Sequence, residues 1–196
     1  MQLFSPCRVT DQKFTPAGDL VIVGENTTSV RTFPDLPDLR IRRQLTFSPD
    51  LTAVTFDVKL TNTTENVMND VGHRWFFMPS AWNNKNGGSM VLGGKAFTRP
   101  HGYTFYKKDI DSVSEEIIRR IFLVKSPTVA VDSSALGFKA PGKKSMEIAF
   151  SPADALGGVA VWDTPELFSP TCEPCLKPVQ IPPGGNVVFS VRISLR

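Results

Sequence analysis

The chain has 196 residues, of which 41% are hydrophobic and 21% are charged, values typical of a soluble globular protein. This length is sufficient for a hydrophobic core without disulfides or a structural metal, so we expect one domain over residues 1–196. The net charge of +3 is too small to indicate nucleic-acid binding through the electrostatic field.

The strongest basic cluster is Arg40-Ile41-Arg42-Arg43. Its alternation with apolar residues is typical of a strand with one polar face, so we expect no nucleic-acid partner. Residues 1–6 lack the basic start and apolar run of a secretory signal. Since no stretch approaches the roughly 18 apolar residues of a membrane span, the sequence predicts a cytoplasmic protein without membrane contact.

Residues 1–38 predict an N-terminal edge segment or arm. It contains one short strand at 20–23 and a loop at 33–38 whose two prolines prevent regular pairing. Two strands are then predicted at 39–47 and 53–60, joined by a turn at Ser48-Pro49-Asp50. The second strand alternates apolar and polar residues four times in succession, which indicates a half-buried strand.

The next part of the chain holds the densest aromatic cluster, Gly72–Pro79, and two glycine pairs that predict turns around a strand at 90–92. Residues 109–124 fit both a helix and a strand, and we expect a helical turn at 112–116 leading into a strand. Further strands are predicted at 128–131, 145–150, 158–162 and 186–195. Strands at short spacing with little helix predict an all-β fold, an antiparallel β-sandwich.

The three cysteines are Cys7, Cys172 and Cys175. A Cys-x-x-Cys pair occurs in dithiol redox sites and in zinc sites. The prolines after Cys175 prevent the helix that a redox motif requires, and a zinc site would have to draw on Cys7, His73 or His101. We therefore expect unpaired thiols, no metal and no cofactor.

The chain contains no phosphate-binding loop, no dinucleotide-binding glycine motif, no serine-hydrolase elbow and no His-Glu-x-x-His motif. These absences argue against the common nucleotide, nicotinamide and serine-hydrolase chemistries. Catalytic candidates are therefore few, because the chain has only two histidines, His73 and His101.

Two segments carry a resemblance to a known family. In the first, an alternating strand ends in Leu60-Thr61-Asn62 and is followed by His73 with aromatic neighbours. In the second, a strand bearing Trp162 precedes a proline-punctuated loop with Glu173, and a Pro183-Gly184 turn introduces the last strand. Over residues 39–78 and 145–196 the chain resembles the galactose mutarotase (aldose 1-epimerase) superfamily.

The resemblance implies that Glu173 is the base that removes the proton from the anomeric hydroxyl of a sugar. His73 would be the acid that protonates the ring oxygen, because ring opening needs both groups at one C–O bond. Aromatic rings can stack on sugar faces, and the segment 99–103 reads as an exposed loop able to donate hydrogen bonds. The candidate substrate-binding residues are Arg74, Trp75, His101 and Trp162.

The sequence leaves two interpretations open. One is a carbohydrate-recognising, mutarotase-like domain, active or degenerate, that interconverts sugar anomers. The other is a non-catalytic β-sandwich that forms a homo-oligomer or serves as a coat, spike or accessory subunit of a larger assembly. In that case His73 is a histidine at the edge of the core and Glu173 is a loop carboxylate near Lys177.

Overall fold

The computed structural model describes residues 8–28, 39–71, 75, 79, 82, 87–100, 102–107, 128–130, 136–163 and 169–196. In these ranges the regular elements are β-strands, and their pairing is antiparallel except between β8 (Tyr103–Lys107) and β9 (Thr128–Ala130). The predicted all-β, antiparallel fold is confirmed. Within the same ranges, no helix has the length and apolarity needed to cross a membrane.

The chain divides into two compact units. The first consists of Met1–Val71 and Pro178–Ser194, and the second of Gly72–Lys177 and Leu195–Arg196. The single domain expected from the length stays a prediction.

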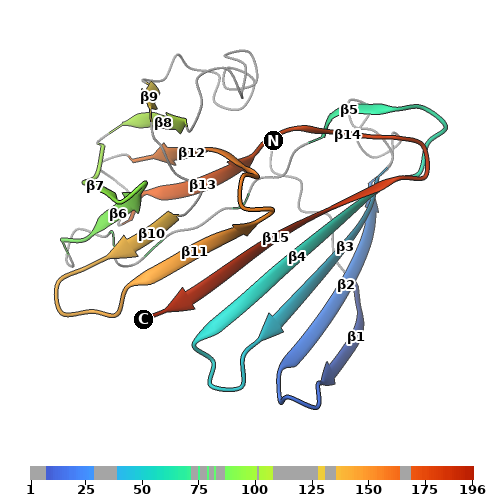
Figure 1. Ribbon diagram of the computed structural model, residues 1–196, viewed down its shortest axis with the longest axis horizontal. Helices are drawn as coiled ribbons and strands as arrows, with labels where there is room; N and C mark the ends of the chain where they lie inside the picture. Colours follow the sequence, from blue (N-terminus) through green and yellow to red (C-terminus); the bar gives the residue numbers. More distant parts are fainter. Residues whose placement is uncertain are drawn as a thin grey trace. The chain divides into compact units, whose positions relative to one another are not determined.

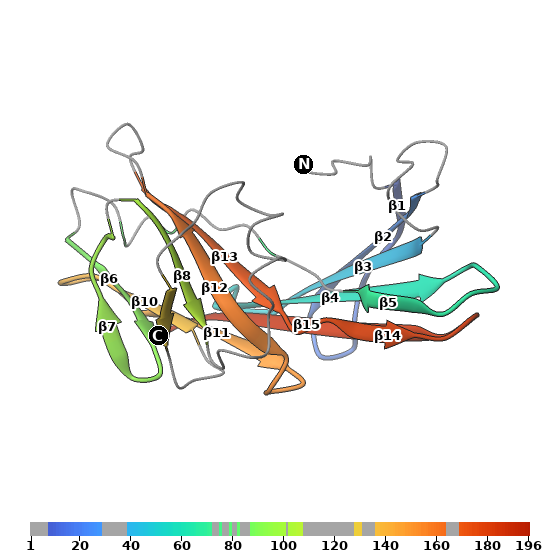
Figure 2. The ribbon, with the colours of Figure 1, turned by 90° about the horizontal axis from the view of Figure 1, so that it is seen from above.

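The first unit contains five neighbouring antiparallel strands of one sheet, which lie side by side in Figure 1. A separate two-stranded sheet pairs two short strands, which run next to each other in Figure 2. The five strands, in their order across the sheet, are β1 (Arg8–Phe14), β2 (Leu20–Thr28), β3 (Leu39–Phe47), β4 (Ala53–Asn62) and β15 (Asn186–Leu195). The two short strands are β5 (Met68–Val71) and β14 (Val179–Ile181).

The core of the first unit lies where β4 and β15 pair. Val58 is directly opposite Phe189, so both side chains project from the same face of the sheet. Val58 and Phe189 are buried, as is Val191 on the same face two residues further along β15. The strands predicted at 39–47, 53–60 and 186–195 are confirmed, and in β4 and β15 the two-residue period matches a face with buried residues.

The turns of this sheet follow from a few polar residues and one glycine. Between β1 and β2, Thr15 N donates to Asp19 O and Gly18 N donates to Thr15 O, both at 2.9 Å. Gly18 has a φ of +88°, which side chains with a Cβ rarely adopt, as this three-residue hairpin loop requires. The predicted turn at 48–50 joins β3 and β4, and Ser48 N donates to Ala53 O.

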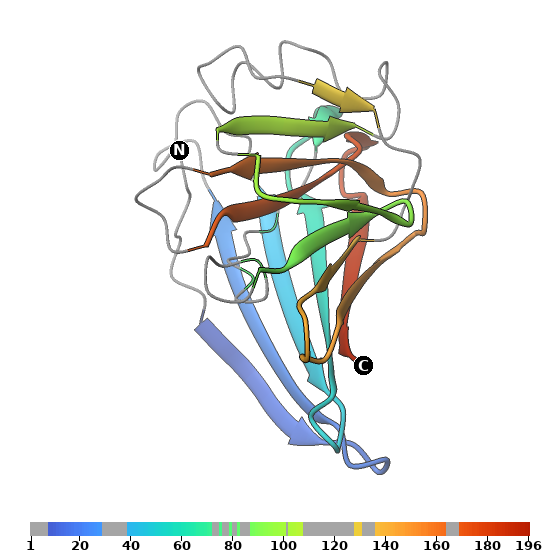
Figure 3. The same cartoon turned by 90° about the vertical axis from the view of Figure 1, so that its left-hand side faces the viewer.

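The second unit contains two sets of four neighbouring strands, each from a different sheet. One has the order β11 (Met146–Ser151), β10 (Leu136–Lys139), β6 (Ser89–Leu92), β7 (Lys95–Phe97). The other has the order β13 (Thr171–Leu176), β12 (Leu156–Trp162), β8, β9 (Figure 3). The rings of Phe97 on β7 and Tyr106 on β8 meet edge to face at 4.9 Å between centroids, so the two sheets pack as a sandwich.

The structure corrects the predicted loop around Glu173. Residues 171–176 form β13, a strand at the edge of its sheet. Pro174 is tolerated there because its carbonyl points away from β12, where it accepts a hydrogen bond from Trp75 N, and the missing N–H lies on the same open side. The strands β1, β8 and β10 were not predicted, and the predictions for 109–124 lie outside the described residues.

Candidate functional site

Glu173 lies in the middle of β13, directly opposite Ala160 on β12. Residues opposite one another in an antiparallel pair project from the same face, as do residues two apart on one strand. Glu173 therefore shares a face with Thr171 on its own strand and with Trp162, which is opposite Thr171. We call this the Glu173 face.

The Glu173 face is closed to solvent at the carboxylate and open at one end. Glu173 is 6% exposed, and the Thr171 hydroxyl lies 3.3 Å from Oε1, where it can donate a hydrogen bond. Trp162 is 39% exposed, an unusual value for so large an apolar side chain. A buried acidic group thus lies on the same face as an accessible aromatic ring.

The other face of these strands is the interior of the sandwich. Val161, which lies between Ala160 and Trp162 on β12, is fully buried, and Cys172 opposite it is also fully buried. Burial raises the pKa of the Cys172 thiol well above its ordinary value, and the Glu173 and Cys175 charges add to this effect. Burial likewise raises the pKa of Tyr106, with smaller contributions from Cys172 and Asp163.

Cys172 and Cys175 are both buried, and neither forms a disulfide within the described residues. A spacing of three residues on a strand places the two side chains on opposite faces, so the thiols cannot act together as a dithiol. Cys175 Sγ donates to the carbonyl oxygen of Glu173 at 3.4 Å. Within the described residues, no three His, Cys, Asp or Glu side chains gather as a metal site would require.

Trp75 is held against the outer edge of β13, where its backbone N donates to Pro174 O at 3.2 Å. Its side chain is buried and packs on Phe150 of β11, with ring centroids 6.2 Å apart. Of the two tryptophans proposed to bind a sugar, Trp162 shares the Glu173 face and Trp75 packs in the core. His73, Arg74, His101 and Cys7 lie outside the described residues.

An ion pair that the sequence did not predict lies next to Trp162. Asp163 is fully buried and accepts a hydrogen bond from Arg99 Nε at 3.0 Å, and a second one from Arg99 Nη2. Asp163 N also donates to Gly102 O at 3.1 Å. Arg99 and Gly102, both within the segment 99–103 that was predicted as an exposed loop, thus bond to Asp163 at the end of β12.

No protein-family model matches the sequence, and no curated protein is significantly similar to it. Solved structures are similar in fold. The Slr1438 protein from Synechocystis sp. PCC 6803 matches with a TM-score of 0.64 at 11% identity, covering 97% of this chain and 65% of that protein. A galactose mutarotase-like protein from Clostridium acetobutylicum matches with a TM-score of 0.63 at 8% identity, covering 98% of this chain and 67% of the other.

A galactose mutarotase related enzyme from Lactobacillus acidophilus gives a TM-score of 0.58 at 11% identity, with 98% of this chain and 71% of the other covered. The chain therefore spans about two thirds of the length of these structures, 65% in the case of the Synechocystis protein. At such identities the likeness concerns the fold alone. In fold, this chain is similar to the galactose mutarotase-like proteins, as the motifs around Asn62 and Trp162 predicted.

Proposed function

We propose that the Glu173 face binds a hexose and interconverts its anomers, as an aldose 1-epimerase does. The observation that carries the proposal is the common face of Glu173 and Trp162 on neighbouring strands. The fold likeness to galactose mutarotase-like proteins supports the same reaction class.

The burial of Glu173 fits a proton-transfer role. A carboxylate shielded from bulk water interacts strongly with a bound substrate, since little water lies between them to screen the interaction. The Thr171 hydroxyl donates a hydrogen bond to Oε1 of the carboxylate and so helps to orient it for proton transfer. The acid in the proposal is His73, a role that only the sequence resemblance suggests.

Trp162 would position the sugar. An indole ring offers a flat apolar surface to the C–H face of a pyranose, and 39% of this side chain is accessible. The Arg99–Asp163 ion pair fixes the residue that follows Trp162, so the ring is attached to a rigid strand end. Rigid attachment lowers the entropy lost on binding.

The reaction would proceed through the open-chain sugar. Glu173 takes the proton of the anomeric hydroxyl, the bond between C1 and the ring oxygen breaks as C1=O forms, and the acid delivers a proton to the ring oxygen. Rotation about C1–C2 and reclosure with reversed proton transfers give the other anomer. Both protons return to their donors, so no cofactor is consumed.

The test is the rate of α/β exchange of galactose and glucose, followed by polarimetry and by NMR exchange spectroscopy. Wild-type protein should accelerate exchange above the buffer rate. Glu173→Gln should lower kcat by about 100-fold or more, because a general base contributes about 10²–10⁴. Glu147→Gln, the same change at a half-exposed carboxylate on β11, should leave the rate unchanged.

Exchange at the buffer rate in the presence of folded wild-type protein would overturn the proposal. So would a Glu173→Gln variant as active as wild type, with folding of each variant checked by circular dichroism. A protein that binds galactose without exchange would contradict the isomerase and leave a lectin-like module.

A further inference from the structure

Strand β1 is the outermost strand of its sheet, and each of its residues, Arg8–Phe14, is exposed. Within the described part of the chain, no strand pairs with its outer edge. Phe14 is 72% exposed on this strand. Open edges attract other strands, and proteins commonly protect them with prolines or a covering segment.

The hairpin fixes which backbone groups point outward. Thr15 N donates to Asp19 O, so this pair is hydrogen-bonded, and in an antiparallel ladder hydrogen-bonded pairs recur every second residue. Lys13 and Asp11, opposite Val21 and Val23, therefore turn their backbone groups toward β2. The N–H and C=O groups of Gln12 and Phe14 point away from the sheet.

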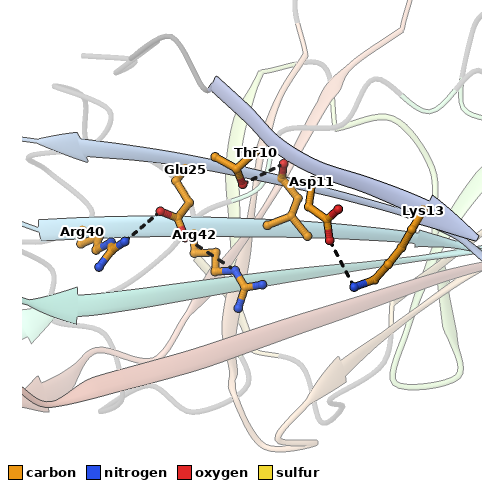
Figure 4. Close-up of polar contacts among 7 residues, drawn as sticks. Thr10, Asp11, Lys13, Glu25, Arg40 and Arg42 are labelled. Atoms are coloured by element: carbon orange, nitrogen blue, oxygen red, sulfur yellow. Dashed lines mark hydrogen bonds and ion pairs between the residues drawn. The ribbon is translucent and has the colours of Figure 1, made fainter. Parts of the chain in front are cut away.

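The charges along β1 select one register for a second, identical strand. Asp11 and Lys13 project from the same face and form an ion pair at 3.2 Å, with side chains 47% and 62% exposed (Figure 4). If two copies pair antiparallel about Gln12, outward backbone groups meet at the centre. Asp11 of each copy then lies opposite Lys13 of the other.

The neighbouring registers are unfavourable. Sliding one strand past the other by two residues, in one direction or the other, places Asp11 opposite Asp11 or Lys13 opposite Lys13. Like charges directly opposite on a sheet are destabilising, whereas opposite charges stabilise. Of these three registers, the one centred on Gln12 places opposite charges opposite each other.

We propose that two copies of this chain associate through β1, antiparallel and two-fold symmetric about Gln12, to form one continuous intermolecular sheet. The Gln12 N–H of each copy donates to the Gln12 C=O of the other. The two Asp11–Lys13 contacts lie at non-hydrogen-bonded positions, where side chains approach most closely. Such an interface is isologous and closed, so it predicts a dimer and not a filament.

The test is the mass of the full chain by sedimentation equilibrium and light scattering over a range of protein concentrations. Wild type should show a monomer–dimer equilibrium. Asp11→Lys and Lys13→Asp should each raise the dimer dissociation constant by about 10-fold or more, since each creates like-charged pairs. An equimolar mixture of the two variants should form a heterodimer, because opposite charges then face each other again.

Two further variants distinguish pairing through the β1 edge from a general effect of changed surface charge. Gln12→Pro removes an outward N–H without removing a β1–β2 hydrogen bond, and it should give monomers. Glu65→Lys, a charge reversal in an exposed turn, should dimerise as wild type does. A wild-type chain that stays monomeric, or single variants that dimerise like wild type, would overturn the proposal, as would a mixture that does not restore association.

This proposal and the enzymatic one can fail independently. β1 belongs to the first unit and Glu173 to the second, and one measurement reads mass while the other reads anomer exchange.

Discussion

Asp163 and Arg99 show how a pair of residues far apart in the chain can fix a strand end. The two are 64 positions apart, and their side chains are 0% and 10% exposed. A buried ion pair adds little net stability over an apolar pair of similar volume. Removing one partner is costly, however, because it leaves the other charge in a region of low dielectric constant.

We expect Asp163→Leu to lower the free energy of unfolding by about 3–5 kcal/mol, since the Arg99 guanidinium is left buried without its carboxylate. The double variant Arg99→Met/Asp163→Leu should recover most of this loss. Asp154→Leu, at a carboxylate that is 75% exposed, should change it by less than about 0.5 kcal/mol. Urea unfolding measures all three, and an Asp163→Leu cost near that of Asp154→Leu would contradict the account.

Asp50 is a residue whose protonation should affect the turn between β3 and β4. The Ser48 hydroxyl donates to its carboxylate at 2.7 Å, and Thr52 donates through its backbone N and its hydroxyl. These hydrogen bonds, with Ser48 the largest cause, lower the pKa of Asp50 from 3.8 to about 2.

Because the folded-state pKa is depressed, the stabilisation from Asp50 is complete above about pH 4 and is lost as the pH falls through about 2. NMR titration of the Asp50 carboxyl carbon should give a midpoint near 2, and Ser48→Ala should move it toward 3.8. A midpoint near 3.8 in the wild type would show that the turn hydrogen bonds are not formed in solution.

At the scale of elements, Asn62 explains why β4 ends where it does. Its side chain is fully buried, and its Nδ2 donates to Asn66 O at 2.7 Å and to Ile181 O at 3.0 Å. Its Oδ1 accepts from Thr64 N and from the Thr64 hydroxyl. One amide thus joins the end of β4 to β14, which gives the Leu60-Thr61-Asn62 motif a structural role.

We expect Asn62→Ala to lower the free energy of unfolding by about 2–3 kcal/mol, because the buried Ile181 carbonyl loses its donor and the turn at Thr64 loses its acceptor. Asn66→Ala is the matched control, since Asn66 contributes backbone groups to this network. It should cost less than about 0.5 kcal/mol. Equal costs for the two variants, measured by thermal unfolding, would contradict the role assigned to Asn62.

In the second unit, strands β12 and β8 approach closely at Gly158. A Cβ added to Gly158 of β12 would lie 2.7 Å from Tyr106 O and 2.7 Å from the Phe105 ring of β8. Any side chain there would force the two strands apart. The pairing of β12 with β8, and with it the position of the Glu173 face, depends on this glycine.

At the scale of the whole molecule, the fold is similar to proteins with which the chain shares about one residue in ten. Such a fold is retained through the alternation of buried and exposed positions, which many sequences satisfy. Catalysis depends instead on the few side chains that the fold places together.

The sequence by itself determined the all-β class and the strands at 39–47, 53–60 and 186–195. The alternation of apolar and polar residues along each of these strands is a local signal, which does not depend on the neighbouring strand. It could not predict β1, whose residues are all exposed and carry no apolar period. The sequence pointed to Glu173 and its candidate role, but it did not predict that Glu173 lies in a strand.

Only the tertiary structure decided which groups meet. Pro174 allows a strand because β13 lies at a sheet edge, and a sheet edge is a property of strand order. Asp163 finds Arg99, and Glu173 shares a face with Trp162, through pairings between segments that the sequence does not connect. Local patterns encode which face is buried, whereas contacts between distant segments depend on how the strands are ordered in space.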